Sequence, residues 1–250
     1  MEAKVLKIIK KIDLFYKKLY EETTNSLQVS LKDNGTSVSQ FDLDATAFCI
    51  EVINEAYANA NIWIEEDQAI LKSDADEYTW IIDPLDGTAS FLRGYPVWGI
   101  GIGVLKNGEP LLSYFYGPAC NQKYLSYENK IFINDQELSH ENNVLNQDTQ
   151  TIFISSRLHK KIDFKEFEEY KIRNFGSTLY HLFMVVLGKA ESTLIGSCYI
   201  WDVAAVFELS EKLGFEFVNF QTQELISISD LMAYKSNKID TILEFKKAPK

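Results

Sequence analysis

The sequence predicts an α+β fold, in which helices and antiparallel strands are followed by alternating strands and helices. Apolar residues recur at helical spacing near the N-terminus, and from about residue 61 they give way to short apolar runs separated by turn residues. After a polar stretch at 140–149, apolar segments of strand and helix length alternate. We therefore predict an N-terminal half over residues 1–149 and a C-terminal α/β half over residues 150–250.

The N-terminal half is expected to begin with two helices. The first carries apolar residues at helical spacing with lysines on its other face: Val5, Ile8, Ile9, Ile12, Phe15 and Leu19. A polar loop, KDNGTSVSQFD, follows, and the alanine-rich segment 43–60 predicts a second helix. Short buried strands are expected at NIWI and YTWII, followed by an antiparallel meander through VWGIGIGVL, PLLSYFYG, KYLSYE and KIFIND. The alternating glycines of GIGIG leave one strand face small and lack the spacing of a dinucleotide-binding loop.

The C-terminal half alternates in character. Strands are expected at TIFISS, YKIRNF, ESTLIG and FEFVNF, and helices at KIDFKEFEEY, STLYHLFMVVLG and VAAVFELSEKLG. The last of these helices should end at Gly214, because glycine favours the left-handed conformation that closes a helix.

Composition and charge limit the function classes. Apolar residues make up 46% and charged residues 24% of the 250 residues, which is typical of a globular protein. The net charge of −11 argues against a nucleic-acid partner, but a metal could still neutralise a small phosphorylated substrate locally. No apolar stretch approaches the roughly 20 residues of a membrane span, and the N-terminus has no signal-peptide pattern, so we expect a cytoplasmic protein without a membrane partner.

The stretch WIIDPLDGTASF carries the strongest chemical signal. Asp83 and Asp86 end an apolar run, and Gly87 and Thr88 follow them. Turn chemistry alone explains a Pro and an Asp-Gly pair. Acids at the ends of other apolar elements favour a second interpretation: Glu65, Glu66 and Asp202. Oxygen-only ligands select hard cations such as Mg²⁺, Mn²⁺ or Ca²⁺, and a Gly-Thr helix start can face a phosphate. Both interpretations remain open on spacing alone.

The histidines do not indicate a hydrolytic triad. His140, His159 and His181 have no G-x-S-x-G partner in the sequence. His181 lies in an apolar helical pattern and is predicted to be a packed core residue.

Two motifs carry a family resemblance. Asp83-Pro84-Leu85-Asp86-Gly87-Thr88 resembles the D-P-[IL]-D-G-T signature of the inositol monophosphatase family, and Trp201-Asp202-Val203-Ala204-Ala205 resembles its W-D-x-A-A signature. Smaller features extend the resemblance along the chain: Val38-Ser39, Asp42, Glu65-Glu66, Phe91, Arg93-Gly94, Pro96, Ser155-Ser156-Arg157 and Gly176-Ser177. The resemblance implies a layered αβαβα sandwich and a metal-dependent phosphoric monoester hydrolase that is usually a homodimer and is inhibited by lithium.

The resemblance also implies residue roles. Two or three Mg²⁺ ions per site, replaceable by Mn²⁺, would be held by these metal ligands: Glu65, Asp83, the Leu85 carbonyl, Asp86 and Asp202. Three residues would activate and orient the attacking water, with no phosphoenzyme formed: Glu65, Thr88 and Asp42. The substrate would be bound by six residues: Gly87, Thr88, Ser155, Gly176, Ser177 and Thr178.

The substrate is the least determined part of the resemblance. Inositol monophosphatases usually carry an acid shortly before W-D-x-A-A that binds a sugar hydroxyl, and this chain has Leu194-Ile195-Gly196 there. Ser156-Arg157-Leu158-His159 resembles a stretch of the bisphosphate nucleotidases, which act on adenosine bisphosphate. We rank an inositol monophosphatase-like activity first and a bisphosphate nucleotidase second, with fructose bisphosphatase and histidinol phosphatase as further alternatives. A non-catalytic regulatory protein is the alternative of another class, but such a copy should have lost one of the acids, and none is lost.

Overall fold

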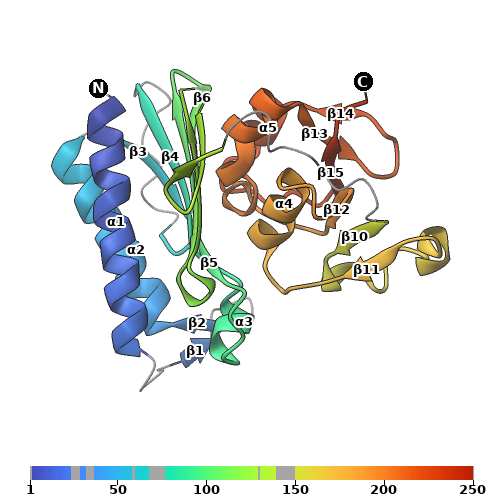
Figure 1. Cartoon of the computed structure of the whole chain (residues 1–250), viewed down its shortest axis with the longest axis horizontal. Helices are drawn as coiled ribbons and strands as arrows, with labels where there is room; N and C mark the ends of the chain where they lie inside the picture. Colours follow the sequence, from blue (N-terminus) through green and yellow to red (C-terminus); the bar gives the residue numbers. More distant parts are fainter. Residues whose placement is uncertain are drawn as a thin grey trace.

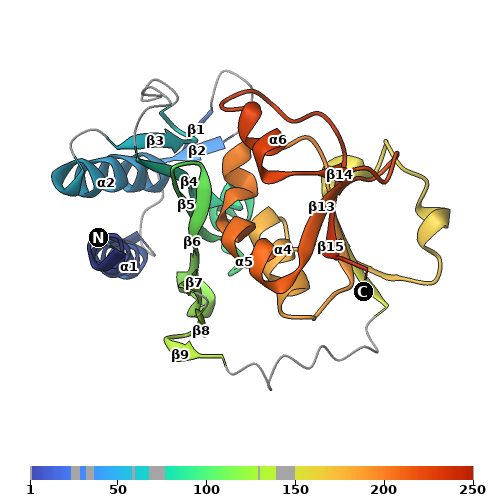
Figure 2. The same cartoon turned by 90° about the horizontal axis from the view of Figure 1, so that it is seen from above.

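The structure, a computed structural model, describes residues 2–23, 29–31, 37–57, 60–67, 77–128, 130–138 and 150–249. Two β-sheets stand side by side with helices between them, and the two N-terminal helices cover the outer face of the first sheet (Figures 1 and 2). The fold is therefore a mixed α+β fold in layers, as the sequence predicts. The linker expected at 140–149 lies outside the described residues, so the boundary between the two halves stays a prediction.

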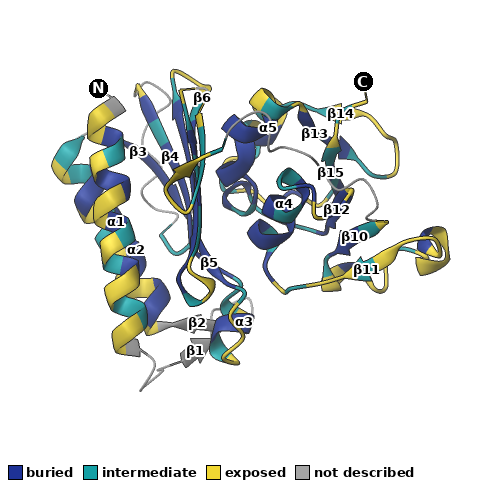
Figure 3. Cartoon of the chain, in the orientation of Figure 1, coloured by how far each residue is buried: buried dark blue, intermediate teal, exposed yellow. Residues whose placement is uncertain are grey.

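The outermost layer consists of α1 (Glu2–Thr23) and α2 (Gln40–Ala56), and their apolar faces are buried while their outer faces are exposed (Figure 3). Helix α2 begins and ends earlier than the 43–60 that the sequence predicts. Between the helices, β1 (Val29–Leu31) pairs antiparallel with β2 (Ser37–Ser39). The polar loop expected here is thus partly a two-stranded sheet, which its polar composition hides.

The first sheet has seven strands in sequence order: β3 (Asn61–Ile64), β4 (Tyr78–Asp86), β5 (Gly99–Lys106), β6 (Glu109–Gly117), β7 (Gln122–Tyr127), β8 (Lys130–Ile133) and β9 (Gln136–Glu137). Strands β3 and β4 are parallel, and every later neighbouring pair is antiparallel. The predicted meander is confirmed. One face of this sheet packs on α1 and α2, and the other packs on the helices between the sheets.

The second sheet has six strands in the order β11-β10-β12-β15-β13-β14. Their bounds are β10 (Thr151–Ile154), β11 (Lys171–Arg173), β12 (Ser192–Ile195), β13 (Phe215–Asn219), β14 (Leu225–Ile226) and β15 (Leu243–Lys247). Strand β15 lies between β12 and β13, antiparallel to both. This strand is not predicted from the sequence, because Glu244 and the two final lysines leave no continuous apolar run.

Two predicted helices of the C-terminal half form between the sheets. Helix α4 (Thr178–Val186) is capped by Ser177, whose side chain accepts from the Tyr180 N–H. A short 3₁₀ turn leads into α5 (Phe207–Leu213), which ends at Gly214 in the left-handed conformation, as predicted. A further short helix, α6 (Ile228–Ala233), precedes β15.

The helix predicted over KIDFKEFEEY is wrong. The structure has only a 3₁₀ turn at Phe164–Phe167, opened by the Asp163 side chain, which accepts from the Lys165 N–H at 3.0 Å. Phe167 packs under the second sheet, while Phe164 is exposed. The apolar residues of this segment are therefore too few on one side to bury a continuous helical face.

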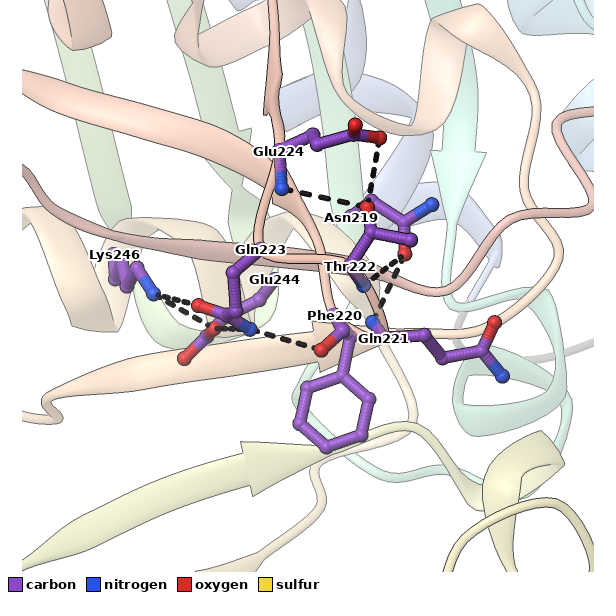
Figure 4. Close-up of polar contacts among 8 residues, drawn as sticks. All are labelled: Asn219, Phe220, Gln221, Thr222, Gln223, Glu224, Glu244 and Lys246. Atoms are coloured by element: carbon purple, nitrogen blue, oxygen red, sulfur yellow. Dashed lines mark hydrogen bonds and ion pairs between the residues drawn. The ribbon is translucent and has the colours of Figure 1, made fainter.

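Polar side-chain contacts fix the hairpin between β13 and β14 in the second sheet (Figure 4). The Asn219 Oδ1 accepts from the N–H groups of Gln221 and Thr222, at 2.9 and 3.2 Å. The Gln223 side-chain oxygen accepts from Lys246 Nζ at 2.8 Å, which ties the hairpin to β15. The Asn219 contacts are local turn contacts, and together with the contact from Lys246 they account for the polar cluster without a ligand.

The glycines of β5 allow the two halves to approach closely. A Cβ on Gly103 would lie 2.5 Å from the Ala204 carbonyl oxygen, and one on Gly101 would lie 2.2 Å from a Leu179 methyl carbon. The prediction that these glycines leave one strand face small is confirmed. The small face brings the segment that carries Asp202 against the first sheet.

An ion pair between a buried carboxylate and an exposed lysine also joins the layers. Glu208 of α5 is buried, accepts a short hydrogen bond from the Ser126 hydroxyl on β7 and pairs with Lys212 one helical turn later. Its backbone N–H donates to the Ser113 hydroxyl on β6 at 3.1 Å. The carboxylate therefore fastens α5 to the first sheet.

Replacing Lys212 by methionine is expected to lower the free energy of unfolding by about 1–3 kcal/mol, because Glu208 would stay buried without its cation. Urea unfolding measures this loss. The matched control is Lys18→Met, which removes the exposed pair with Glu22 and should change stability by about 0.5 kcal/mol or less. Equal losses in both variants would contradict the stabilising role of the pair between Lys212 and the buried Glu208.

Candidate metal centre

Two carboxylates lie at the end of β4. The pairing of β4 with β5 runs regularly to Asp83, which faces Gly101, and then shifts before Asp86, which faces Gly99. Pro84 and Leu85 occupy this bulge, and the Leu85 N–H donates to Asp83 Oδ1 at 3.0 Å. Because a bulge re-aims the residues that follow it, both acids can turn toward one space.

The bulge is also held from the outer helix layer. The Tyr16 hydroxyl on α1 donates to the Pro84 carbonyl at 2.6 Å, and both groups are buried. Sequence reasoning does not identify this contact, since Tyr16 belongs to an ordinary amphipathic pattern and no local motif links it to Pro84.

A third carboxylate comes from the other half of the chain. Asp202 ends a 3₁₀ turn (Ile200–Asp202), and its Oδ2 accepts from the Tyr199 N–H at 2.7 Å. One carboxylate oxygen from each of Asp83, Asp86 and Asp202 lies within 4.8 Å of the others. The structure thus brings together three of the residues that the sequence predicts as metal ligands.

Asp86 is anchored by the start of α4. Its carboxylate accepts from the Ser177 hydroxyl in a short bond, from the Thr178 N–H at 3.1 Å and from the Leu179 N–H at 2.8 Å. A helix N-terminus favours a negative charge, so this contact orients and stabilises the carboxylate. Ser177 and Thr178, which the sequence predicts to bind substrate, lie in the structure against Asp86.

Glu65 lies beside this group. It follows β3 and is half-buried, and its backbone N–H donates to the Ile82 carbonyl at 3.3 Å, next to Asp83 in the chain. The parallel pairing of β3 with β4 therefore delivers Glu65 and Asp83 to the same edge of the sheet.

The turn after Asp86 is glycine-dependent. Gly87 has a φ of 89°, and α3 (Thr88–Leu92) begins directly after it, as predicted. The Thr88 hydroxyl lies 3.0 Å from the Leu85 carbonyl and 3.4 Å from Asp42 Oδ1. The hydroxyl has one proton, and the shorter distance makes Leu85 its main acceptor, with the buried Asp42 as the second.

Burial and mutual repulsion raise the pKa values of the acids in the cluster. Burial raises the pKa of Asp83 well above its usual value, and the charges of Glu65, Asp86 and Asp202 raise it further. Burial also raises the pKa of Asp202 to about 8. For Asp86, burial outweighs the hydrogen bonds from the start of α4 and raises the pKa to about 6. The positive charge of Arg157 opposes the rise in the pKa of Asp202.

This chemistry fits a hard divalent cation. The donors are carboxylate oxygens, they converge from separate elements, and their mutual repulsion is relieved when a cation lies between them. Nitrogen or sulfur donors, which softer metals prefer, are not part of the cluster found among the described residues.

The metal-free protein is expected to lose stability as the pH rises from about 4 to about 8. Asp86 and Asp202 have folded-state pKa values of about 6 and about 8, above the usual 3.8. In this window the folded state binds more protons than the unfolded state, so the free energy of unfolding falls as the pH rises. The thermal midpoint measured in chelator at several pH values tests this. The Asp202→Asn variant should show a shallower decline, and an equal slope in both proteins would contradict the assignment.

The remaining predicted residues lie on the segments that follow β10 and precede α4. Ser155 follows β10, and its N–H donates to the Leu194 carbonyl at 3.0 Å. Gly176 has a φ of 77° and precedes Ser177. Ser90 is buried, and its hydroxyl donates to the Phe175 carbonyl at 3.3 Å, so it links α3 to the loop before α4. The sequence does not predict this contact, because no local motif links Ser90 to Phe175.

Leu194 and Ile195 of β12 are both buried among apolar side chains. Nearby, the Arg157 guanidinium is exposed and donates to the Ser197 carbonyl at 3.2 Å. Among the described residues, no helix is long and apolar enough to span a bilayer.

Comparison with known proteins shows the family of this chain. The model of the inositol monophosphatase family matches residues 2–243. An inositol-1-monophosphatase of Mesorhizobium japonicum is 28% identical over 198 residues, which cover 76% of this chain and 74% of that protein. A Nus factor SuhB of Xylella fastidiosa is 27% identical over 218 residues, covering 84% of this chain and 77% of that protein.

Solved structures share the fold. An IMPase/NADP phosphatase complexed with Mg²⁺ and phosphate superposes with a TM-score of 0.83 at 16% identity, covering 98% of this chain and 91% of that one. A staphylococcal inositol monophosphatase-1 in a LiCl-soaked inhibitory complex gives a TM-score of 0.84 at 16% identity, covering 99% and 91%. The chain belongs to the inositol monophosphatase family and is a phosphoric monoester hydrolase.

Proposed function

We propose that this chain hydrolyses the phosphate ester of a small metabolite with Mg²⁺, which Mn²⁺ can replace, at the cluster of Asp83, Asp86 and Asp202. The observation that carries the proposal is the convergence of one oxygen from each of these acids within 4.8 Å. Glu65 and the Leu85 carbonyl complete the ligand set that we propose for two or three ions. When bound, the cations neutralise the phosphate, activate water and stabilise the leaving oxygen.

The chain's own residues would supply position and proton transfer. Glu65, half-buried beside Asp83, would accept a proton from the attacking water. The Thr88 hydroxyl, shared between Leu85 and Asp42, would fix the direction of that water. The left-handed turn at Gly87 lets the backbone amides of Gly87 and Thr88 approach a phosphate oxygen.

The substrate side would be formed by Ser155 and the loop that carries Gly176, with Ser177 and Thr178 acting through Asp86. We propose an inositol monophosphate-like substrate first, in line with the family. The second candidate is a bisphosphorylated nucleoside. Two observations favour it: buried Leu194 replaces the usual sugar-binding acid, and exposed Arg157 lies close enough to Asp202 to lower its pKa against the effect of burial.

A purely regulatory role is not favoured, although one similar protein bears the name Nus factor SuhB. The complete acid set and its convergence support catalysis. Two further expectations rest on the family resemblance: a homodimer and inhibition by lithium. The cytoplasmic location that the sequence predicts also stays an expectation. Light scattering coupled to gel filtration would test the homodimer.

The test is phosphate release from the unmodified protein with Mg²⁺ on four substrates: inositol monophosphate, adenosine bisphosphate, fructose bisphosphate and histidinol phosphate. Each reaction is repeated with lithium and with chelator. We expect one substrate to be preferred, with release abolished by chelator and reduced by lithium. Release that persists in chelator would contradict the proposed metal centre, and a preference for adenosine bisphosphate would replace the first substrate by the second.

A further inference from the structure

We propose that His181 is a positioning residue for the metal centre: its neutral imidazole holds the loop 174–177 in the conformation that delivers three hydrogen bonds to Asp86. The inference rests on the proposed function, because it assigns to His181 an effect on a metal ligand proposed above. The prediction that His181 is a packed core residue is confirmed, and the inference adds a positioning role to it.

The imidazole makes one specific polar contact. His181 is 3% exposed, and its Nε2 accepts from the Phe175 N–H at 2.8 Å. The acceptor role of Nε2 assigns the ring proton to Nδ1. Burial lowers the pKa of His181 to about 3, so the ring is neutral and keeps this acceptor at physiological pH.

The ring cannot turn away from this contact easily. Phe153 of β10 stacks on it with ring centroids 4.7 Å apart and an interplanar angle of 20°, and Phe175 packs on it at 6.0 Å. The imidazole is therefore fixed between the second sheet and the loop. An apolar side chain of the same shape would fill the space but would leave the Phe175 N–H without its acceptor.

Hydrogen bonds hold each residue of the loop 174–177. The Asn174 side chain donates to the Ile154 carbonyl and accepts from the Gly176 N–H, both at 2.7 Å. Phe175 is held from both sides, by His181 at its N–H and by Ser90 at its carbonyl. Gly176, at a φ of 77°, then turns the chain toward Asp86.

The loop ends on the carboxylate. Ser177 directly follows Gly176, and its hydroxyl donates to Asp86, as do the next two N–H groups of α4. His181 lies on the first turn of the same helix, and its side chain accepts from the Phe175 N–H of the preceding loop. The loop that His181 holds is therefore the loop that leads into the Asp86 contacts. Groups that orient metal ligands in this way typically change metal affinity by about 10–100-fold when they are removed.

The experiment compares variants by Mn²⁺ binding, followed by the electron paramagnetic resonance of free Mn²⁺, and by amide exchange. His181→Phe keeps the aromatic stack and removes the acceptor, whereas His181→Gln places an amide oxygen at a similar reach from Cβ. We expect His181→Phe to weaken Mn²⁺ binding about tenfold and to speed exchange of the Phe175 amide, and His181→Gln to restore most of the affinity.

The matched control is Phe153→Leu, which loosens the same packing but leaves the acceptor in place. If it lowers the thermal midpoint as much as His181→Phe but keeps Mn²⁺ affinity, the polar contact is the cause. Equal loss of affinity in both variants, or unchanged affinity in His181→Phe, overturns the inference. Should His181→Phe not fold, Asn174→Ala loosens the same loop from an exposed position and must weaken Mn²⁺ binding for the inference to stand.

Asp86→Asn separates this inference from the proposed function. If Asp86→Asn binds Mn²⁺ like the unmodified protein, the proposed metal centre is wrong and the inference falls with it. If Asp86→Asn loses binding while His181→Phe keeps it, only the inference about His181 is wrong.

Discussion

Replacing Asp83 by asparagine is expected to reduce phosphate release at least about a thousandfold, which corresponds to roughly 4 kcal/mol of transition-state stabilisation. Asp83 is the most buried acid of the cluster, and the charges of Glu65, Asp86 and Asp202 all act on it. Removing its charge weakens a side chain that we propose as a ligand of the cations. Steady-state release with saturating Mg²⁺ on the preferred substrate measures the effect.

The same substitution should act on stability in the opposite direction. Asparagine keeps a side-chain oxygen for the Leu85 N–H, and it removes one buried charge from a repelling group. In chelator near neutral pH, the thermal midpoint of Asp83→Asn should therefore lie above that of the unmodified protein. Asp135→Asn, which removes an exposed acid outside the cluster, is the control and should change neither quantity appreciably. An inactive variant that is also less stable in chelator would indicate a misfolded protein rather than a lost ligand.

Replacing Gly103 by alanine is the second prediction with a large effect. The new Cβ would lie 2.5 Å from the Ala204 carbonyl oxygen, which is backbone and cannot rotate away. Overpacking of this kind costs about 1–3 kcal/mol, and relief requires the segment after Asp202 to move from the sheet. We therefore expect both a lower free energy of unfolding and weaker Mn²⁺ binding.

Gly108→Ala provides the matched control for Gly103→Ala. Gly108 has a φ of 87°, so alanine is strained there, but nothing lies within 4 Å of its Cβ position. This variant should lose about 1 kcal/mol of stability and keep its Mn²⁺ affinity. If Gly103→Ala loses stability but also keeps its Mn²⁺ affinity, the contact between β5 and Ala204 does not position Asp202.

The parts of the fold that follow from local pattern are predictable from the sequence. The amphipathic N-terminal helix and the antiparallel meander are confirmed, because their periodicity reflects one buried face. Strand β15 and the paired β1 and β2 escape prediction, since their partners rather than their composition make them strands. The helix predicted at 161–170 is wrong because a charged segment with scattered apolar residues resembles a helix locally.

The residues of the candidate site also fall into two groups: those that local motifs predict and those that only the tertiary structure reveals. Asp83, Asp86 and Asp202 are recognisable from two motifs, and the structure places them together, while their roles as ligands stay a proposal. Tyr16, Ser90 and His181 could not be found, because each acts through one hydrogen bond to a distant or ordinary-looking backbone group. Such contacts depend on tertiary placement, and no sequence pattern records them.

Asp202 lies in the C-terminal half of the chain, so the cluster of three acids is completed only late in translation. Asp83 and Asp86 leave the ribosome together with their strand, whereas Asp202 and the start of α4 that steadies Asp86 follow much later. Because chains begin to fold from the N-terminus as they emerge, the first sheet can form while its acids still lack their partners. If the three acids bind the cation as we propose, binding of native strength requires that Asp202 has been synthesised. A chain that ends before Asp202 would then bind Mg²⁺ only weakly and release little phosphate.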